Sequence, residues 1–312
     1  MSDRIAISQK SLFSSKSIAF LCLAIACLIF SSSPVCVRWS EQEISPIATV
    51  FDRFFFGAIV FGLGNGVNLL GAQKTDTESA FYSPKIILFL LGAGICAAGN
   101  QMSWAFSIAQ TNIGNSSLMH SLTPLFTTLL AWLFLNRSFD RRFLIGIMVA
   151  IGGSIAIGIG EFQIDTTKLQ GDSLALLSAV FFAIYLLIVE RLRVSLNANN
   201  ILFWRCLLGT TFLLPILLFN GDRLLPYSQS GWLAVACLTL TFIISHGLLA
   251  YCLKILSSSL VAIVLLLDPF LSSMQAWIFF SEQLTVLEWI SLAIVILGVY
   301  LAISSPSPKV SE

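Results

Sequence analysis

Long apolar runs alternate with short polar segments along the whole 312-residue chain. Most runs are nearly continuous over about 20 residues, which is the length that an α-helix needs to cross the hydrocarbon core of a bilayer. Strands of a membrane barrel would instead show alternating patterns of about ten residues. The pattern predicts an all-α, polytopic membrane protein whose ten transmembrane helices cover residues 17–39, 46–70, 85–109, 113–136, 142–160, 171–192, 199–219, 231–254, 257–281 and 285–304.

The composition agrees with a membrane protein. Hydrophobic residues make up 57% of the chain and charged residues only 11%, whereas an ordinary soluble domain has roughly 25% charged residues. A net charge of +1 gives no reason to expect nucleic acid as a partner. The seven cysteines lie in or beside apolar runs without metal-type spacing. We therefore interpret them as packing residues and expect neither a metal nor a cofactor.

A segment of the fourth predicted span returns 145 positions later in the ninth. Residues 122–134 and 267–279 share a frame of proline, six residues, and then Ala-Trp-x-Phe. This frame pairs Pro124 with Pro269, and two tryptophans, at one offset, and both residue types are scarce in this chain. The second and seventh spans also correspond, because Phe51-Asp-Arg53 aligns with Phe203-Trp-Arg205. These matches indicate an internal repeat.

The repeat divides the chain into two halves of five spans. Because five is odd, each half enters the membrane from the opposite side, so the repeats are inverted about an axis in the membrane plane. The predicted organisation is a cytoplasmic tail, a first five-helix repeat, an external linker, a second five-helix repeat and a cytoplasmic tail, covering residues 1–16, 17–160, 161–170, 171–304 and 305–312.

Lysine and arginine set the orientation. With the N-terminus inside, twelve of these residues fall in inside loops or tails and three in outside ones. Cytoplasmic loops of membrane proteins carry the excess of positive charge. We therefore expect a multi-pass protein of the cell (inner) membrane with both termini in the cytoplasm. The loops are short, so any activity must be located within the helix bundle.

Polar residues inside the predicted spans are the candidate site. Such groups are costly in hydrocarbon and normally face a protein interior or a wet cavity. Helical spacing places several of them in stripes beside Pro124 and Pro269, and we expect kinks at these prolines and at Pro34. The predicted substrate cavity comprises Asn100, Gln101, Trp104, His120, Thr123, Tyr185, Arg205, His246, Asp268, Ser272 and Gln275. The alternative for each is local: Ser and Thr often bond to their own helix, and a lone histidine is equally well explained by packing.

Two features rise above that background. Asp268 lies near the middle of the ninth span, where an ionised carboxylate costs on the order of 2.5–3.5 kcal/mol. It must be protonated, paired or hydrated there, and a role in proton coupling is our hypothesis, with a fixed structural acceptor as the alternative. The other feature is the equivalent pair Arg53 and Arg205. Arg205 is the better cavity candidate, because Arg53 follows Asp52 and can be neutralised locally or reach the interface.

The ten spans, the inverted repeat and the proline-containing fourth helix of each half resemble the drug/metabolite transporter superfamily, specifically its EamA-like family. Asp268-Pro269 and Ser281-Glu282 resemble the acid-before-proline and Gly-Glu-like turn of the family's second copy, whereas Arg137 stands where its first copy has the turn glutamate. The resemblance implies a central cavity lined by the third, fourth, eighth and ninth helices, with the first and sixth, that works by alternating access.

The leading hypothesis is therefore a secondary transporter that exports small metabolites such as amino acids, with proton coupling left open. One alternative is a facilitator or exchanger of sugar-phosphate-like solutes, since distant relatives transport these. The other is an intramembrane enzyme, but the chain has no His-Glu-x-x-His, Gly-x-Ser-x-Gly or phosphate-loop motif. The expected partners are a small-molecule metabolite and the lipid bilayer; a homodimer is left open.

Overall fold

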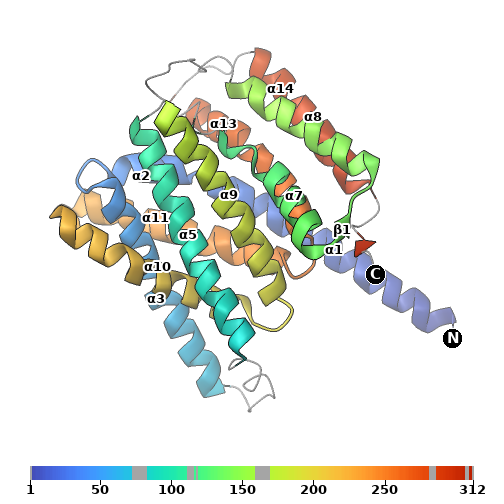
Figure 1. Cartoon of the computed structure of the whole chain (residues 1–312), viewed down its shortest axis with the longest axis horizontal. Coiled ribbons are helices and arrows are strands. Elements are labelled where there is room, and N and C mark those ends of the chain that lie inside the picture. The colour runs from blue at the N-terminus through green and yellow to red at the C-terminus, as the bar shows by residue number, and fades with distance from the viewer. Residues whose placement is uncertain are drawn as a thin grey trace.

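The computed structural model describes residues 2–71, 83–110, 116, 119–158, 169–280, 286–305 and 309–310. This part of the chain is almost entirely helical (Figure 1). The first half contains α1 (Ser2–Phe30), α2 (Ser33–Ser40), α3 (Pro46–Gly71), α5 (Pro84–Gln110), α7 (Thr123–Leu135) and α8 (Arg141–Gly158). The second half contains α9 (Leu169–Leu192), α10 (Ala198–Asn220), α11 (Gln229–Cys252), α12 (Ser258–Val264), η2 (Leu265–Leu267), α13 (Asp268–Phe280) and α14 (Val286–Ile303).

Five helices of the described chain are long and apolar enough to cross a membrane by length and composition, namely Pro46–Gly66, Pro84–Ser107, Leu169–Leu192, Ala198–Asn220 and Gln229–Cys252. Shorter apolar helices occupy Ser15–Phe30, Thr123–Leu135, Ser258–Leu271 and Trp289–Ile303. The all-α class of membrane protein is thus confirmed. The one small addition is a two-residue antiparallel pair of β1 (Arg137–Ser138) with β2 (Lys309–Val310), which attaches the C-terminal segment beside the end of α7.

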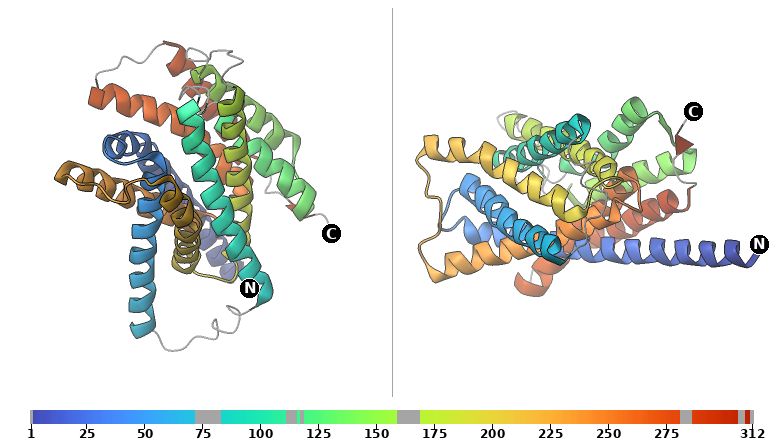
Figure 2. Two further views of the ribbon diagram at one scale, coloured as in Figure 1. Left: turned by 60° about the vertical axis from the view of Figure 1, so that its left-hand side comes forward. Right: turned by 90° about the horizontal axis from the view of Figure 1, so that it is seen from below.

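Helices of the first half pack mainly against helices of the second half. The principal partners are α8 with α14, α5 with α9, α3 with α10, and α1 with α11 (Figures 1 and 2). Each of these pairs takes one helix from each half of the chain. The core therefore lies between the halves, and polar side chains that face it are enclosed by both.

The first and ninth predicted spans are each broken rather than continuous. In the first, α1 ends at Phe30, and the hydroxyls of Ser31 and Ser32 donate to the Leu28 carbonyl at 2.8 and 3.3 Å. Such bonds compete with the helix ladder, and α2 then restarts with a proline in its first two positions. In the ninth span, a 3₁₀ turn at Leu265–Leu267 separates α12 from α13. Ser31 in the first break is buried, so its hydroxyl lies within the core.

The predicted kinks at Pro34, Pro124 and Pro269 take the form of helix starts. Pro34 and Pro124 occupy the first two positions of α2 and α7, and Pro269 is the second residue of α13. Proline is well tolerated in the first turn because its missing N–H would have no helical partner there. Each proline therefore stands where the helical backbone is interrupted or begins again, and the kinks themselves stay a prediction.

Close backbone packing joins α8 to α14. A side chain built on Gly146 would meet the Ala302 nitrogen and the Gly298 oxygen at 2.7 Å, and one on Gly298 would collide with the backbone of Ala150. Gly146 and Ala150 of α8 thus form a close contact with α14. This contact fixes the pair of helices that stands at one side of the bundle (Figure 1).

Candidate functional site

Two buried arginines, one from each half, converge on the ring of Phe242 in α11. Arg205 of α10 is 0% exposed and Arg53 of α3 is 4% exposed. Their guanidinium carbons lie 5.0 and 5.9 Å from the centre of the Phe242 ring. The Arg205 guanidinium also lies 4.5 Å from the ring of Tyr185 and 5.6 Å from that of Phe54. The repeat-equivalent arginines therefore share one aromatic environment in the core.

The hydrogen bonds of Arg205 leave part of its guanidinium unused. Its Nη1 donates to the Tyr185 hydroxyl at 3.1 Å, whereas Nε and Nη2 are buried without a partner. A charged group in a bilayer core costs on the order of 2.5–3.5 kcal/mol even on insertion scales, so unused donors on a buried arginine are unusual. The stacking on Tyr185 and Phe242 offsets part of this cost.

Arg53 is held by polar side chains of two other elements. Its Nη1 donates to Gln101 Oε1 at 3.1 Å and its Nη2 to Ser33 Oγ at 3.4 Å, while Nε has no partner. Asp52 does not neutralise it, because both Asp52 oxygens are buried without a hydrogen-bond partner. Arg53 thus turns into the core rather than reaching the interface, and the local neutralisation considered from the sequence is not seen.

His246 of α11 lies beside the same aromatic ring. Its imidazole centre is 4.5 Å from that of Phe242 and 5.4 Å from that of Phe30. Its Nδ1 is 3.1 Å from the Phe242 carbonyl oxygen, which can only accept, so in the neutral ring Nδ1 carries the proton. The buried Nε2, which has no partner, is then an acceptor. The two arginines and the accepting Nε2 of His246 therefore lie around the same Phe242 ring.

A row of stacked rings leads from the arginine cluster to His120 in the fourth predicted span. Along α9, Tyr185 stacks on Phe182 at 6.1 Å, and Phe182 stacks on His120 at 5.6 Å. His120 Nδ1 lies 3.0 Å from Ser178 Oγ, whose hydroxyl donates to Ala175 O at 2.8 Å. Ser178 therefore accepts from Nδ1 of His120. Thr123 follows the local alternative, since its hydroxyl donates to the His120 carbonyl at 2.6 Å.

The polar residues of α13 lie against α1 rather than against the arginines. Gln275 Nε2 donates to Leu28 O at 3.0 Å and to Ser31 Oγ at 2.7 Å. Asp268 has one buried oxygen, Oδ1, without a hydrogen-bond partner. No recorded hydrogen bond or ion pair within the described part of the chain joins Asp268 to the arginine cluster. The predicted cavity residues therefore form two groups.

The remaining predicted cavity residues are Asn100, Trp104 and Ser272. Asn100 of α5 is buried and its Oδ1 has no partner, and Trp104 is half-buried on the same helix. The side chain of Ser272 lies outside the described residues, as does that of Pro34. The cavity assignment of all these residues stays a prediction.

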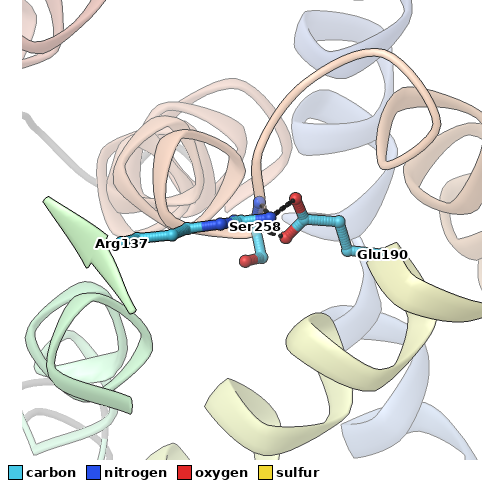
Figure 3. A network of polar contacts seen from close by, with 3 residues as sticks. All are labelled: Arg137, Glu190 and Ser258. Atoms are coloured by element: carbon cyan, nitrogen blue, oxygen red, sulfur yellow. Dashed lines mark hydrogen bonds and ion pairs between the residues drawn. The ribbon is translucent and has the colours of Figure 1, made fainter. Parts of the chain in front are cut away.

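An ion pair joins the two halves of the chain (Figure 3). Arg137 of β1 donates through Nη1 and Nη2 to the two Glu190 oxygens at 3.1 and 2.7 Å. Glu190 Oε2 also accepts from the Ser258 amide, the first of α12, at 3.0 Å. We call Arg137, Glu190 and Ser258 the end latch. It is the one salt bridge found among the described residues.

The opposite end has its own contact between the halves. Glu43, between α2 and α3, accepts from the hydroxyl and amide of Ser228 and from the Tyr227 amide, at the N-terminus of α11. Nearby, Ser45 Oγ donates to Asp222 Oδ2 at 2.8 Å. The hydrogen bond from Ser228, helped by the backbone amides, lowers the pKa of Glu43 below its ordinary value. Both ends are therefore joined by polar contacts.

Sequence reasoning missed the aromatic residues and Glu190. Phe54, Phe182 and Phe242 are three of 25 phenylalanines in apolar runs, so nothing distinguishes them from core residues. Glu190 did carry a signal, because it is an acidic residue in the last turn of a predicted span. The structure shows that it partners Arg137.

The fold and this interior define a polytopic helical membrane protein with charged and aromatic groups enclosed between two halves. The chain belongs to the EamA-like transporter family, whose model matches residues 17–159 and again residues 169–304. Members of the family are transporters, so the chain is a membrane transporter and the enzyme alternative is set aside. The residues called cavity candidates above thus lie in a transporter.

Named relatives span most of the chain. It is 22% identical over 290 residues to an uncharacterized transporter of Archaeoglobus fulgidus, covering 90% of this chain and 96% of that protein. It is 21% identical over 262 residues to the pseudopaline exporter CntI of Pseudomonas aeruginosa, covering 84% and 87%. A protein of known crystal structure shares the fold, with a TM-score of 0.77 at 17% identity over 92% of this chain and 97% of that one.

Proposed function

We propose that this protein is a secondary transporter of the inner membrane that exports small metabolites such as amino acids through a cavity between its halves. The observation that carries the proposal is the arginine cluster: Arg53 and Arg205, from opposite halves, are buried at one aromatic ring with donors unused. Purely structural buried groups are normally fully hydrogen-bonded. Intramembrane charges mark transport pathways more often than packing.

The helix contacts support an inverted five-plus-five repeat. If α1, α3, α5, α7 and α8 correspond in order to α9, α10, α11, α12–α13 and α14, the contact of α5 with α9 becomes that of α11 with α1. In the same way, α5 with α10 becomes α11 with α3, and both contacts are present. Such exchange is what a twofold relation between the halves requires. The predicted topology places both termini in the cytoplasm.

The contacts at the two ends support alternating access as the mechanism. In the proposed orientation the end latch is cytoplasmic and the Glu43 contact is external. Both contacts cross between the halves and consist of a few hydrogen bonds and one ion pair, so each can be exchanged at modest cost. Export as the direction of transport is supported by the likeness to a protein named an exporter.

Proton coupling through Asp268 is a separate part of the proposal. A carboxyl with a buried, unpartnered oxygen at the start of α13 has a free position for a proton. Taking up a proton would remove the cost of its charge, and releasing it requires access to water. Exchange of sugar-phosphate-like anions without proton coupling is the alternative, and the two buried arginines are what favours it.

The test is transport by purified protein in liposomes. Proteoliposomes loaded with a labelled panel of amino acids, organic acids and phosphorylated sugars should release a subset faster than protein-free liposomes. Stimulation of release by the same solute outside would indicate exchange. Stimulation by a proton gradient would indicate coupling. Absence of release for every member, with correctly folded protein, contradicts the proposed function for these classes.

A further inference from the structure

We propose that Arg53 and Arg205 form one anion-binding site, and that the transported solute carries a carboxylate that binds the free edge of Arg205. This inference rests on the proposed transport function, because it names the substrate class for that same interior. It concerns a site that the two halves complete together, since Arg53 comes from α3 and Arg205 from α10.

The free donors of Arg205 have the right arrangement for this ligand. A guanidinium presents Nε–H and one Nη2–H side by side, and a carboxylate binds such an edge through two parallel hydrogen bonds. These two nitrogens are the unpartnered ones in Arg205, while Nη1 is occupied by Tyr185. The Tyr185 bond and the flanking rings therefore orient the guanidinium and leave its Nε–Nη2 edge without a hydrogen-bond partner.

The positive charge of the two arginines also favours a bound anion. The guanidinium carbons of Arg53 and Arg205 lie 5.9 and 5.0 Å from the centre of the Phe242 ring, so two positive charges share this ring. Within the described chain, neither arginine forms an ion pair, and Asp52 makes no hydrogen bond to Arg53. Two like charges that share an apolar interior are stabilised by an anion placed between them. A bound solute with a carboxylate would provide that anion.

The surroundings limit what the rest of the solute can be. Phe54 and Phe242 provide apolar surface at the arginines, and His246 Nε2 adds one buried acceptor near Phe242. A small organic acid or amino acid, with an apolar part and a group that donates a hydrogen bond, matches these features. A phosphate group has the same affinity for an arginine edge, so the experiment must separate the two anions.

The alternative is that the rings simply hold Arg205 as a structural residue. In that case no anion would bind, and substitutions would affect folding alone. Binding can be measured without transport, by thermal unfolding and calorimetry of the full-length protein in detergent. The probes are L-leucine, L-leucinamide, L-glutamate, succinate and inorganic phosphate. Leucine and its amide differ only at the carboxylate, so this pair isolates the group in question.

The expected result is stabilisation by one or more carboxylates and none by leucinamide. Arg205→Lys keeps the charge but loses the paired donors, and should weaken binding at least about tenfold. Arg53→Gln should weaken binding as well, and Tyr185→Phe should do so without loss of the ring stack. Arg223→Gln is the matched control, because this exposed arginine also lies over an aromatic ring, at 5.5 Å from Tyr227, and its binding should equal the parent's.

Several outcomes would decide the matter. Stabilisation by phosphate alone keeps the anion site but overturns the carboxylate as its ligand, and assigns the site to phosphorylated solutes. Equal binding of leucine and leucinamide, no binding of any anion, or unchanged affinity in Arg205→Lys overturns the site. If Arg205→Lys does not fold, Tyr185→Phe and the two leucine probes still give the answer. Anion binding without flux in liposomes would overturn transport but not this site, whereas arginine-independent flux would overturn this site but not transport.

Discussion

Breaking the end latch should loosen one end of the bundle. The perturbation is Arg137→Gln or Glu190→Gln, each of which removes one charge and keeps the approximate shape. The two side chains are 14% and 13% exposed, so the pair lies between a surface ion pair and a buried one. Surface pairs contribute about 0.2–1 kcal/mol, and breaking a buried pair costs about 3–5 kcal/mol.

We expect a coupling free energy of about 2 kcal/mol between Arg137 and Glu190, because the bond is bidentate and hydrogen bonds to charged groups contribute about 1.5–3 kcal/mol. If the latch is broken when this end opens, that energy corresponds to a roughly 30-fold shift toward the open form. The thermal stabilities of both single variants and the double variant give the coupling through a mutant cycle.

Hydrogen exchange reports the opening directly. The Ser258 amide donates to Glu190, so it should exchange faster in Glu190→Gln, and also in Arg137→Gln, where the amide itself is untouched. Arg141→Gln is the matched control, since it removes an exposed positive charge at the same end. A coupling below about 0.5 kcal/mol, together with unchanged exchange at Ser258, would refute the reasoning.

Three further predictions follow from particular contacts. Gly298→Ala should lower the melting temperature, because its Cβ would meet the Ala150 backbone and overpacking costs about 1–3 kcal/mol, whereas Gly152→Ala, with open space, should not. The lowered pKa of Glu43 means that its contact stabilises the fold above its ordinary pKa of 4.5 and is lost as pH falls through the lowered value; Glu43→Gln should therefore melt with a weaker dependence on acidic pH. Asp268→Asn should preserve folding and binding but abolish the effect of a proton gradient on transport, and an undiminished effect would exclude it as the coupling residue.

The helical architecture was predictable because the bilayer imposes a length on each apolar run. The second span, predicted over 46–70, is observed as α3, Pro46–Gly71. The breaks were not predictable in the same way. Leu265–Leu267 is as apolar as its neighbours, so hydropathy cannot show that the backbone changes here from α-helix to a 3₁₀ turn. A break depends on local bonds such as those from Ser31 and Ser32, which sequence periodicity does not report.

The candidate site was predictable where charge is costly. Arg205 and His246 were chosen because polar groups in a span need a reason, and the structure places both at the ring of Phe242. The same reasoning cannot select Phe242 itself, because burying a phenylalanine ring in an apolar span carries no free-energy penalty that would mark it as unusual. It also grouped Gln275 with these residues, although its amide bonds to α1, because helical spacing gives a face but not the neighbour that this face meets.

The residues of the end latch can be compared with their equivalents in the internal repeat. The offset of 145 residues pairs Arg137 with Glu282, and the offset of 152 that relates the second and seventh spans pairs Glu190 with Arg38. Both correspondences reverse the charge. Under an inverted repeat, corresponding positions lie at opposite ends of the bundle, so an equivalent of the end latch would lie at the other end with its charges reversed. The side chain of Arg38 and the whole of Glu282 lie outside the described residues, so the structure bears on Arg137 and Glu190 alone. Their contact at 2.7 Å shows that Arg137, which stands where the resemblance places a glutamate, has an acidic partner in the other half of this chain.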